Sequence, residues 1–181
     1  MKIIPSDNAT IFVAAVHSLI CVARMNGEYG VFARESIRAG QTLFRIEGEY
    51  KREPSRYSVQ VGWRIHIDSD GNKSLEELLD RRPWRFTNHS CDANTMVRRQ
   101  EVVAIRMISA GEEVTLNYNA TEYQMAFPFT CRCGSLSCVG RISGFRYLSH
   151  SEQERLRPFL NDYLQNLTVQ VKPEVREPAW R

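Results

Sequence analysis

Short runs of β-branched and aromatic residues, many of them alternating with polar residues, dominate the chain. This pattern is typical of β-strands, because successive side chains of a strand point to opposite faces of the sheet. Turn sequences such as Ala39-Gly40 and Ala110-Gly111 separate several of the runs. The runs predicted as strands are 11–16, 19–24, 30–33, 42–46, 57–61, 63–67, 96–98, 101–107 and 113–117. We therefore expect several small sheets rather than a regular alternation of strands and helices.

Two helices are predicted by their starting sequences. Ser74 and Glu77 have the spacing of a capping box, and Pro83 should end the short helix that follows. Ser151 and Glu154 have the same spacing ahead of the second helix. In this second segment apolar residues recur at helical spacing: Leu156, Leu160, Tyr163, Leu164 and Leu167.

Proline limits the second helix. Pro158 lies inside the periodic segment and should kink or divide it, because proline lacks the backbone N–H that an α-helix requires. Beyond about residue 168 the chain carries Pro173 and Pro178, and we expect an irregular tail there.

Composition favours one folded core with a small appendage. The chain has 181 residues, of which 43% are hydrophobic, and this is too short for two full domains of common size. Its 24 basic and 21 acidic residues are interspersed, giving a net charge of +3. Because no basic tract stands out, we expect no direct nucleic-acid binding.

Residues 9–22 form the most apolar stretch of the chain. The stretch is too short to span a bilayer and is interrupted by His17 and Ser18, so we interpret it as core strands. No cleavage site follows it clearly, which predicts neither a signal peptide nor a membrane segment. With no membrane contact expected, we place the protein in an intracellular, reducing compartment, cytoplasmic or nuclear.

Four of the five cysteines form one pattern. Cys131, Cys133 and Cys138 lie within eight residues, and Cys91 lies forty residues upstream of the first of them. Four thiolates that converge on one ion favour Zn²⁺ in tetrahedral coordination. The odd count also fits metal binding better than a set of disulfides. Cys21 is left over and is expected to be an inert buried thiol.

Three motifs occur in a recognisable order. Residues 85–94 read Arg-Phe-Thr-Asn-His-Ser-Cys-Asp-Ala-Asn, residues 111–118 read Gly-Glu-Glu-Val-Thr-Leu-Asn-Tyr, and residues 131–138 carry the Cys-x-Cys-x4-Cys spacing. Together they resemble the SET-domain protein-lysine methyltransferases that have a post-SET zinc motif. The resemblance implies an α+β, β-rich SET fold of several small sheets, with a pseudoknot-like active site, a post-SET zinc clip and a C-terminal helix.

The resemblance also implies a division of the chain. Residues 1–126 would form the SET domain, residues 127–140 the post-SET zinc-binding segment, and residues 141–181 a C-terminal amphipathic helix with an irregular tail. It further implies two cofactors, S-adenosylmethionine and Zn²⁺, the ion being held by the four cysteines just named.

Cofactor-binding residues are implied at two places. In the family a glycine-rich turn lies against S-adenosylmethionine, and Gly27, Glu28, Tyr29 and Gly30 occupy that place here. The family usually has Gly-x-Gly before the aliphatic-aromatic pair, whereas Glu28 fills the first of these positions. An ordinary hairpin turn is the alternative interpretation of this segment. The Asn-His pair at 88–89 corresponds to the family residues that hold the methionine amino group and the adenine.

Catalytic roles are implied for tyrosines. Tyr118 occupies the position of the family's active-site tyrosine, which orients the amine, and it would also border the cofactor. Tyr57 resembles a second active-site tyrosine, with Tyr50 as its competitor. Leu116 stands in the substrate pocket where the family commonly has tyrosine or phenylalanine. Asn117 replaces a common aspartate, which suggests altered rather than lost activity.

The function implied by the resemblance is S-adenosylmethionine-dependent methylation of a lysine side chain in a protein. The partner would be a protein substrate with a target lysine, a histone-like protein being one candidate. Two alternatives stay open: an enzyme of the same fold that acts on a small molecule or catalyses another reaction, and a zinc-stabilised interaction module whose cofactor site has decayed. The target lysine and the oligomeric state are not encoded in any motif of the sequence.

Overall fold

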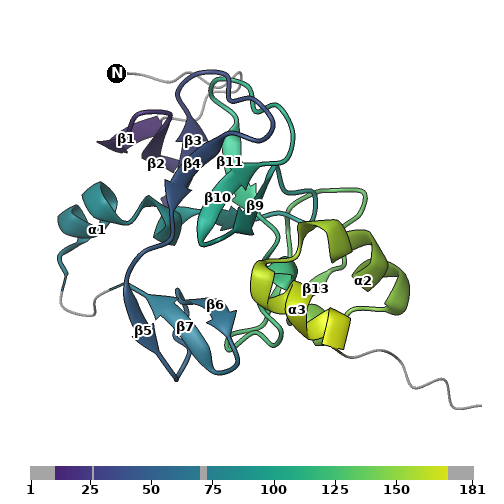
Figure 1. Cartoon of the computed structure of the whole chain (residues 1–181). Coiled ribbons are helices and arrows are strands. Elements are labelled where there is room, and N and C mark those ends of the chain that lie inside the picture. Colours follow the sequence, from purple (N-terminus) through teal and green to yellow (C-terminus); the bar gives the residue numbers. More distant parts are fainter. Residues whose placement is uncertain (1–10, 26, 70–72, 171–181) are drawn as a thin grey trace, which may run out of the picture.

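Three β-sheets and a C-terminal helical segment make up the computed structural model of the chain, which describes residues 11–25, 27–69 and 73–170. The largest sheet contains eight strands, and two small sheets lie beside it. Figure 1 shows the three-stranded sheet below the large sheet and the C-terminal helices against one side of it. The β-rich α+β prediction is confirmed.

The large sheet begins with an antiparallel meander and is completed by strands from the second half of the chain. Its order is β1-β2-β3-β11-β9-β10-β4, and β8 pairs with β11 off this path. The strands are β1 Ile11–Val16, β2 Ile20–Met25, β3 Glu28–Ala33, β4 Thr42–Arg45, β8 Asn88–His89, β9 Thr95–Arg98, β10 Glu101–Ala104 and β11 Glu113–Leu116. Strand β11 is therefore central, since it contacts β3, β8 and β9.

The three-stranded sheet is assembled from residues 49–68. Its strands are β5 Glu49–Lys51, β6 Val59–Gly62 and β7 Ile65–Asp68, in the order β5-β7-β6. Two sequence predictions need correction here. Tyr57 lies in the turn before β6 rather than in a strand, and Trp63 lies in the turn between β6 and β7. The predicted strand 63–67 starts only at Ile65, because Arg64 has a φ of 52° in the left-handed region and turns the chain there.

A two-stranded sheet, β12 Phe129–Thr130 and β13 Arg141–Ile142, encloses the three clustered cysteines. Strands β5, β12 and β13 were not predicted, because two or three residues give no measurable alternation. The predicted strand 101–107 ends earlier, at Ala104.

The first helix, α1 Leu75–Arg81, has the capping box that the sequence predicts. Ser74 Oγ accepts a hydrogen bond from the Glu77 amide, and the Glu77 carboxylate accepts one from the Ser74 amide. A 3₁₀ helix, Pro83–Phe86, follows directly, so the proline ends α1 as expected.

The second helical segment is divided at Pro158, as predicted, but it starts at a different residue. Helix α2, His150–Leu156, is capped by Ser149 with Glu152, so the prediction of Ser151 with Glu154 was wrong. Both pairs have the same spacing, and only the tertiary position of the chain selects between them. After a 3₁₀ turn at Arg157–Phe159, helix α3 covers Asp162–Gln170. The predicted tail beyond this point lies outside the described residues.

Apolar side chains of the C-terminal helical segment pack against the part of the chain that follows β11. Leu156, Leu160 and Leu164 are buried together with Ala120 and Phe145. The apolar periodicity that predicted a helix therefore also marks the residues that face the core. Ala120 follows Tyr118 in the 3₁₀ helix Tyr118–Ala120, which means that the C-terminal helices support the end of β11.

A buried amide joins the same segments. Asn161 Nδ2 donates to the carbonyl oxygens of Gln60 and Thr121, at 2.8 and 3.0 Å, and the Asn161 amide donates to Ala120 O. Irregular backbone that is buried needs such partners, since each unpaired polar group costs free energy. Asn161 therefore holds β6, the segment after β11 and α3 together.

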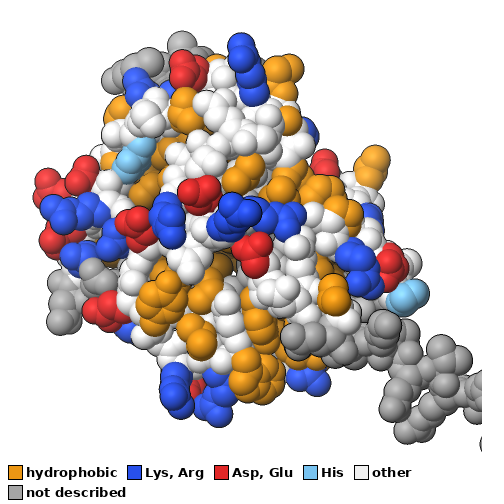
Figure 2. All heavy atoms as spheres, viewed as in Figure 1, with side chains coloured by type: hydrophobic (Ala, Val, Ile, Leu, Met, Phe, Trp, Pro, Cys, Tyr) orange, Lys and Arg blue, Asp and Glu red, His pale blue; other side chains and the backbone are white. Residues whose placement is uncertain are grey.

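Charged side chains of both signs are mixed on the surface. Figure 2 shows basic and acidic side chains next to one another across the face viewed, without a continuous basic region. None of the helices within the described residues is long and apolar enough to cross a membrane.

We predict that the C-terminal helices stabilise the whole fold. Leu164→Ala should lower the free energy of unfolding by about 2–5 kcal/mol, because Leu164 is completely buried and its truncation leaves a cavity. Val169→Ala on the same helix is the control, since Val169 is 74% exposed and should change stability by less than about 0.5 kcal/mol. Urea denaturation measures both, and equal effects would contradict the prediction.

Candidate active site and metal centre

Two chain segments that are distant in sequence are joined at the centre of the site. Strand β8, Asn88–His89, pairs in parallel with the end of β11, and the Ser90 amide donates to Leu116 O at 3.0 Å. Asn117 Nδ2 adds a hydrogen bond to Cys91 O at 3.3 Å. An aspartate at position 117 could not donate this bond, so the amide has a structural use here.

The imidazole of His89 connects these segments to the cysteines. Its Nδ1 accepts a hydrogen bond from the Tyr118 backbone amide at 3.1 Å, so this nitrogen carries no proton. Its Nε2 is then the protonated nitrogen and points to Cys91 Sγ at 3.4 Å. Burial lowers the pKa of His89 to about 4, which keeps the ring neutral. His89 thus links the Cys91 sulfur, a predicted metal ligand, to the backbone of Tyr118.

Tyr118 is buried and fixed at both ends. Its hydroxyl donates to Thr87 O at 2.8 Å while its backbone amide is held by His89. Burial, with smaller contributions from Glu113 and Glu122, raises the pKa of Tyr118. The phenol therefore remains protonated near neutral pH and can orient a ligand, but it cannot serve as a ready base.

Phe129 completes an aromatic cluster that the sequence analysis missed. Its ring lies 5.7 Å from His89 and 6.1 Å from Tyr118, both in edge-to-face geometry. His89 and Tyr118 are themselves 5.2 Å apart. An apolar residue two positions before Cys131 was the only signal in the sequence, and it is too common to be informative.

The predicted cofactor loop is only partly brought to this site. Asn88 Nδ2 donates to Tyr29 O at 2.9 Å and to Glu113 Oε1 at 2.8 Å. The Gly30 backbone lies so close to the Glu113 carboxylate that a Cβ atom at Gly30 would be 2.8 Å from Glu113 Oε1. Tyr29 and Gly30 therefore adjoin Asn88, and the missing side chain of Gly30 is needed for this approach.

Gly27 and Glu28 are placed differently. Gly27 adopts a φ of 89° in the hairpin turn, and Glu28 is exposed and begins β3. Within the described residues no hydrogen bond links either of them to Asn88. Although Glu28 differs from the Gly-x-Gly pattern of the resembling family, the close packing of the Gly30 backbone against Glu113 is present.

Tyr118 and Tyr57 line the same cavity, of about 70 Å³. The Tyr57 ring is stacked under the guanidinium of Arg85, whose Cζ lies 3.9 Å from the ring centroid. Tyr50, the competitor, instead lies on β5, where it bonds Gln100 and is 63% exposed. The geometry favours Tyr57 over Tyr50 as the second tyrosine of the site.

Leu116 also lines this cavity and is buried against Tyr118. Val114 and Leu116 are the two buried residues of β11, in agreement with the predicted alternation. The hydroxyl-bearing side chain that the resembling family often has at this position is replaced here by a purely apolar one.

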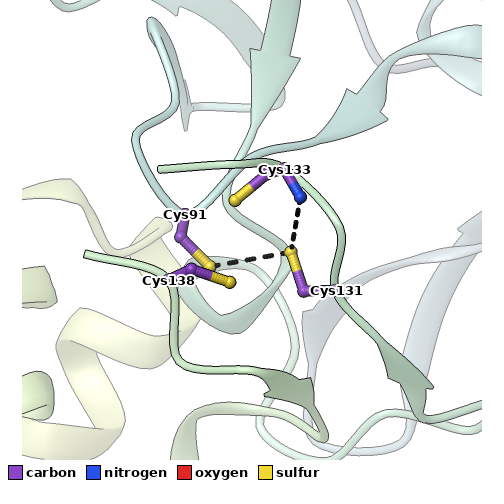
Figure 3. Close-up of side chains that lie close together, drawn as sticks. All are labelled: Cys91, Cys131, Cys133 and Cys138. Atoms are coloured by element: carbon purple, nitrogen blue, oxygen red, sulfur yellow. Dashed lines mark hydrogen bonds between the residues drawn. The ribbon is translucent and has the colours of Figure 1, made fainter. Parts of the chain in front are cut away.

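The four cysteines of the predicted metal site converge. Their sulfur atoms all lie within 4.8 Å of one another, and Figure 3 shows the side chain of Cys91 meeting those of Cys131, Cys133 and Cys138. A tetrahedral Zn²⁺ with Zn–S bonds of about 2.3 Å would hold its sulfurs about 3.8 Å apart. Cys91 Sγ and Cys131 Sγ are 3.9 Å apart, so the donor set fits this ion.

Cys21, the fifth cysteine, is 1% exposed and lies on β2 in an apolar cluster. Burial raises the pKa of its thiol, so it remains protonated and unreactive. The prediction of an inert buried thiol agrees with this position.

Asn94 is a further buried residue that organises the site. Its Oδ1 accepts from the Thr115 amide at 2.9 Å, and its Nδ2 donates to Glu113 O at 2.7 Å. Both bonds fix β11 next to β9. Asn94 is the last residue of the motif at 85–94, but the motif by itself does not predict this role.

Comparison with known families identifies the chain. Residues 28–119 match the SET domain, which is half of the sequence. The chain therefore belongs to the SET-domain family, as its motifs predicted. The matched residues contain strand β3, the Asn-His pair, Cys91 and Tyr118, whereas the other three cysteines of the cluster and the C-terminal helices follow them.

Several relatives are named as methyltransferases. The chain is 37% identical over 128 residues to "Methyltransferase flvH" of Aspergillus flavus, covering 66% of this chain and 65% of the relative. It is 33% identical over 134 residues to a "Histone-lysine N-methyltransferase, H3 lysine-36 specific" of Emericella nidulans, covering 64% of this chain and 13% of the relative. The chain thus spans just under two thirds of the first relative and a small part of the second.

A solved structure described as KRYPTONITE in complex with mCHG DNA and SAH is 25% identical, with a TM-score of 0.48. The similarity covers 62% of this chain and 26% of that one. The family assignment rests on the sequence match.

We predict one zinc ion per chain. Cys138→Ser should weaken zinc binding by at least about 100-fold, because loss of a ligand should cost no less than loss of a residue that orients one. Cys21→Ser is the matched control and should retain one equivalent, since Cys21 lies outside the cluster. Elemental analysis after dialysis against a chelator of moderate affinity measures the difference, and a full equivalent in Cys138→Ser would contradict the assignment.

Proposed function

We propose that the protein is an S-adenosylmethionine-dependent methyltransferase that acts on the lysine side chains of proteins. The observation that carries the proposal is the joined set of His89, Tyr118 and the tyrosine-lined cavity in a chain of the SET-domain family. The proposal agrees with relatives that are named histone-lysine N-methyltransferases.

The residues around Asn88 fit a cofactor of this kind. Asn88 is exposed, and its Oδ1 has no hydrogen-bond partner among the described residues, so it can accept from the amino group of a methionine moiety. The Phe129 ring, which lies beside His89, offers an apolar face. When bound, S-adenosylmethionine would supply a methyl group on a positively charged sulfur.

Methyl transfer to an amine requires alignment more than acid or nucleophilic help from the enzyme. The amine nitrogen and the methyl carbon must be held at about 3–3.5 Å, in line with the bond that breaks. The phenol oxygen of Tyr118, fixed by Thr87 O, can hold the amine nitrogen in that direction. The rings of Tyr57 and Tyr118 exclude water from the cavity.

The three-stranded sheet is the proposed surface for the substrate protein. Tyr50, Trp63 and Ile65 are all exposed there, and Figure 2 shows hydrophobic side chains gathered over β5, β7 and β6. Exposed aromatic residues are common at protein interfaces. A relative is named as a histone-lysine N-methyltransferase that is H3 lysine-36 specific, so histone H3 is the first substrate to test.

A small-molecule substrate is the second candidate. One relative that matches over about two thirds of both chains, flvH, is named only as a methyltransferase. A protein substrate remains the better proposal because the cavity is narrow, about 70 Å³, and borders an exposed apolar sheet.

The chain division and the cellular location form part of the proposal. Residues 1–126 would act as the SET domain, residues 127–140 as the zinc-binding segment and residues 141–181 as a supporting C-terminal region. We place the protein in a reducing intracellular compartment, because its five cysteines form no disulfides in the structure.

Incubation with labelled S-adenosylmethionine tests the function directly. Recombinant histone H3, core histones and a mixture of small amines would be supplied in parallel, with intact-mass and peptide mass spectrometry of the products. Methyl groups on lysine support the proposal, and methylation of small amines alone supports the second candidate. Calorimetry that finds no cofactor binding would reject both.

We predict that Tyr118→Phe separates binding from chemistry. The variant should retain most affinity for S-adenosylmethionine yet lower kcat by about 100-fold or more, because misplacement of a reacting group by about 1 Å can cost that much. Tyr147→Phe is the control, since Tyr147 is 57% exposed and is not among the residues that line the cavity. Normal turnover by Tyr118→Phe would show that Tyr118 only packs.

We also predict that products reach the di- or trimethyl state. Leu116 has no hydroxyl to hold a water molecule beside the amine and is smaller than an aromatic ring, so a methylated amine has room to turn. Leu116→Tyr should shift the products toward monomethyl-lysine. Intact-mass analysis over time measures this, and exclusively monomethylated product from the unmodified enzyme would assign the limit to another residue, such as Tyr57.

A further inference from the structure

Glu122 places a buried carboxyl group at the cavity of the site. Its Oε1 accepts a hydrogen bond from the Gln60 amide at 2.8 Å, and its backbone amide donates to Tyr118 O at 2.9 Å. The residue is 7% exposed and lines the same cavity as Tyr57 and Tyr118. Its second oxygen, Oε2, has no hydrogen-bond partner among the described residues.

A second residue that lines this cavity carries a buried polar group without a partner. Thr87 Oγ1 is buried without a hydrogen bond, although Thr87 is only 3% exposed and lines the cavity. Buried polar groups are nearly always satisfied in folded proteins. An unpaired hydroxyl and a free carboxyl oxygen at one cavity therefore point to a polar ligand that carries hydrogen-bond donors.

The side chain of the cavity lining that would attract a positive ligand is Glu122. Glu122 is the only acidic side chain among the described residues that line it, and Arg56 and Arg85 are the basic ones. Arg85 is engaged with Ser69 Oγ at 2.6 Å and with the Tyr57 ring, and Arg56 is exposed. A carboxylate that is buried without an ion pair is most favourable when a positive ligand arrives.

We propose that Glu122 receives the substrate ammonium group in the cavity and accepts its proton before methyl transfer. This role rests on the proposed function, since it takes a lysine side chain as the substrate. Tyr118 cannot take the role because its phenol stays protonated and already donates to Thr87 O. Glu122 is then a residue that contacts the substrate.

Proton transfer to Glu122 comes before methyl transfer to the amine. One N–H bond of the lysine ammonium breaks, and its proton passes to the Glu122 carboxylate, which leaves a neutral amine and a carboxylic acid. The nitrogen lone pair then forms a bond to the methyl carbon while the carbon–sulfur electron pair stays on sulfur. The products are a methylammonium group and a neutral thioether, and Glu122 returns its proton to solvent.

Titration of Glu122 gives this step a pH dependence. Burial raises the pKa of Glu122 to about 8, against a smaller opposing effect of the Gln60 amide. Below that pH the group is a carboxylic acid and accepts no proton, so kcat/KM should rise as the pH increases through about 8. Ionisable groups on the elements around it are Arg56, Arg85 and Tyr118, with His66 on β7 and Asp162 at the start of α3.

Glu122→Gln tests the proposal in an activity assay, because glutamine keeps an acceptor for the Gln60 amide while removing the charge. With histone H3 as substrate, kcat/KM should fall by about 100-fold, as expected for loss of a general base, and the rise near pH 8 should disappear. The KM for S-adenosylmethionine should not change. Glu154→Gln, on the exposed face of α2, is the control and should match the unmodified enzyme. An unaltered pH profile in Glu122→Gln would overturn the proposal.

A second measurement does not depend on methyl transfer. Carbon-13 NMR of glutamate carboxyl groups would follow the titration of Glu122, assigned by its absence in Glu122→Gln, with and without n-butylammonium. A cation beside the carboxylate should lower its pKa, whereas 1-butanol, a neutral molecule of the same length, should not. A titration unchanged by butylammonium would overturn the role of Glu122. Absence of methylation on any protein, with the butylammonium shift present, would instead reject the proposed function alone.

Discussion

The hydrogen-bond bridge through His89 is the interaction on which the site depends. One nitrogen of its ring accepts from the Tyr118 amide, and the other points to Cys91 Sγ. Because the ring is buried and neutral, each nitrogen has a single fixed role, so the bridge cannot reverse without breaking both contacts. The proposed zinc ion would therefore set the position of Cys91, and through His89 that of Tyr118.

Buried amide side chains make this irregular arrangement possible. Short strands leave many backbone groups without ladder partners, and an amide supplies both a donor and an acceptor to such groups. Asn94 fixes β11 against β9, Asn117 ties its end to Cys91 O, and Asn161 joins it to β6 and α3. The same network holds Gln60 beside Glu122, so the fold itself presents a carboxyl group to the cavity.

The part of the chain that follows the matched SET region contributes to the site in two ways. It supplies three of the four clustered cysteines and the Phe129 ring, and its helices bury Leu160 and Leu164 behind Ala120. Glu122 also belongs to this part.

Local patterns in the sequence determined the strands that alternate, the capping box at Ser74 and the metal-ligand spacing of the cysteines, because each depends on neighbours in the chain. The choice of Ser149 over Ser151 as a helix cap, and of Tyr57 over Tyr50 as a cavity residue, was decided only by tertiary structure. The proposed role of Glu122 also became visible only there. A carboxylate in a sequence looks the same whether it is solvated or buried, and its burial depends on distant segments, here on Gln60, which lies 62 residues away.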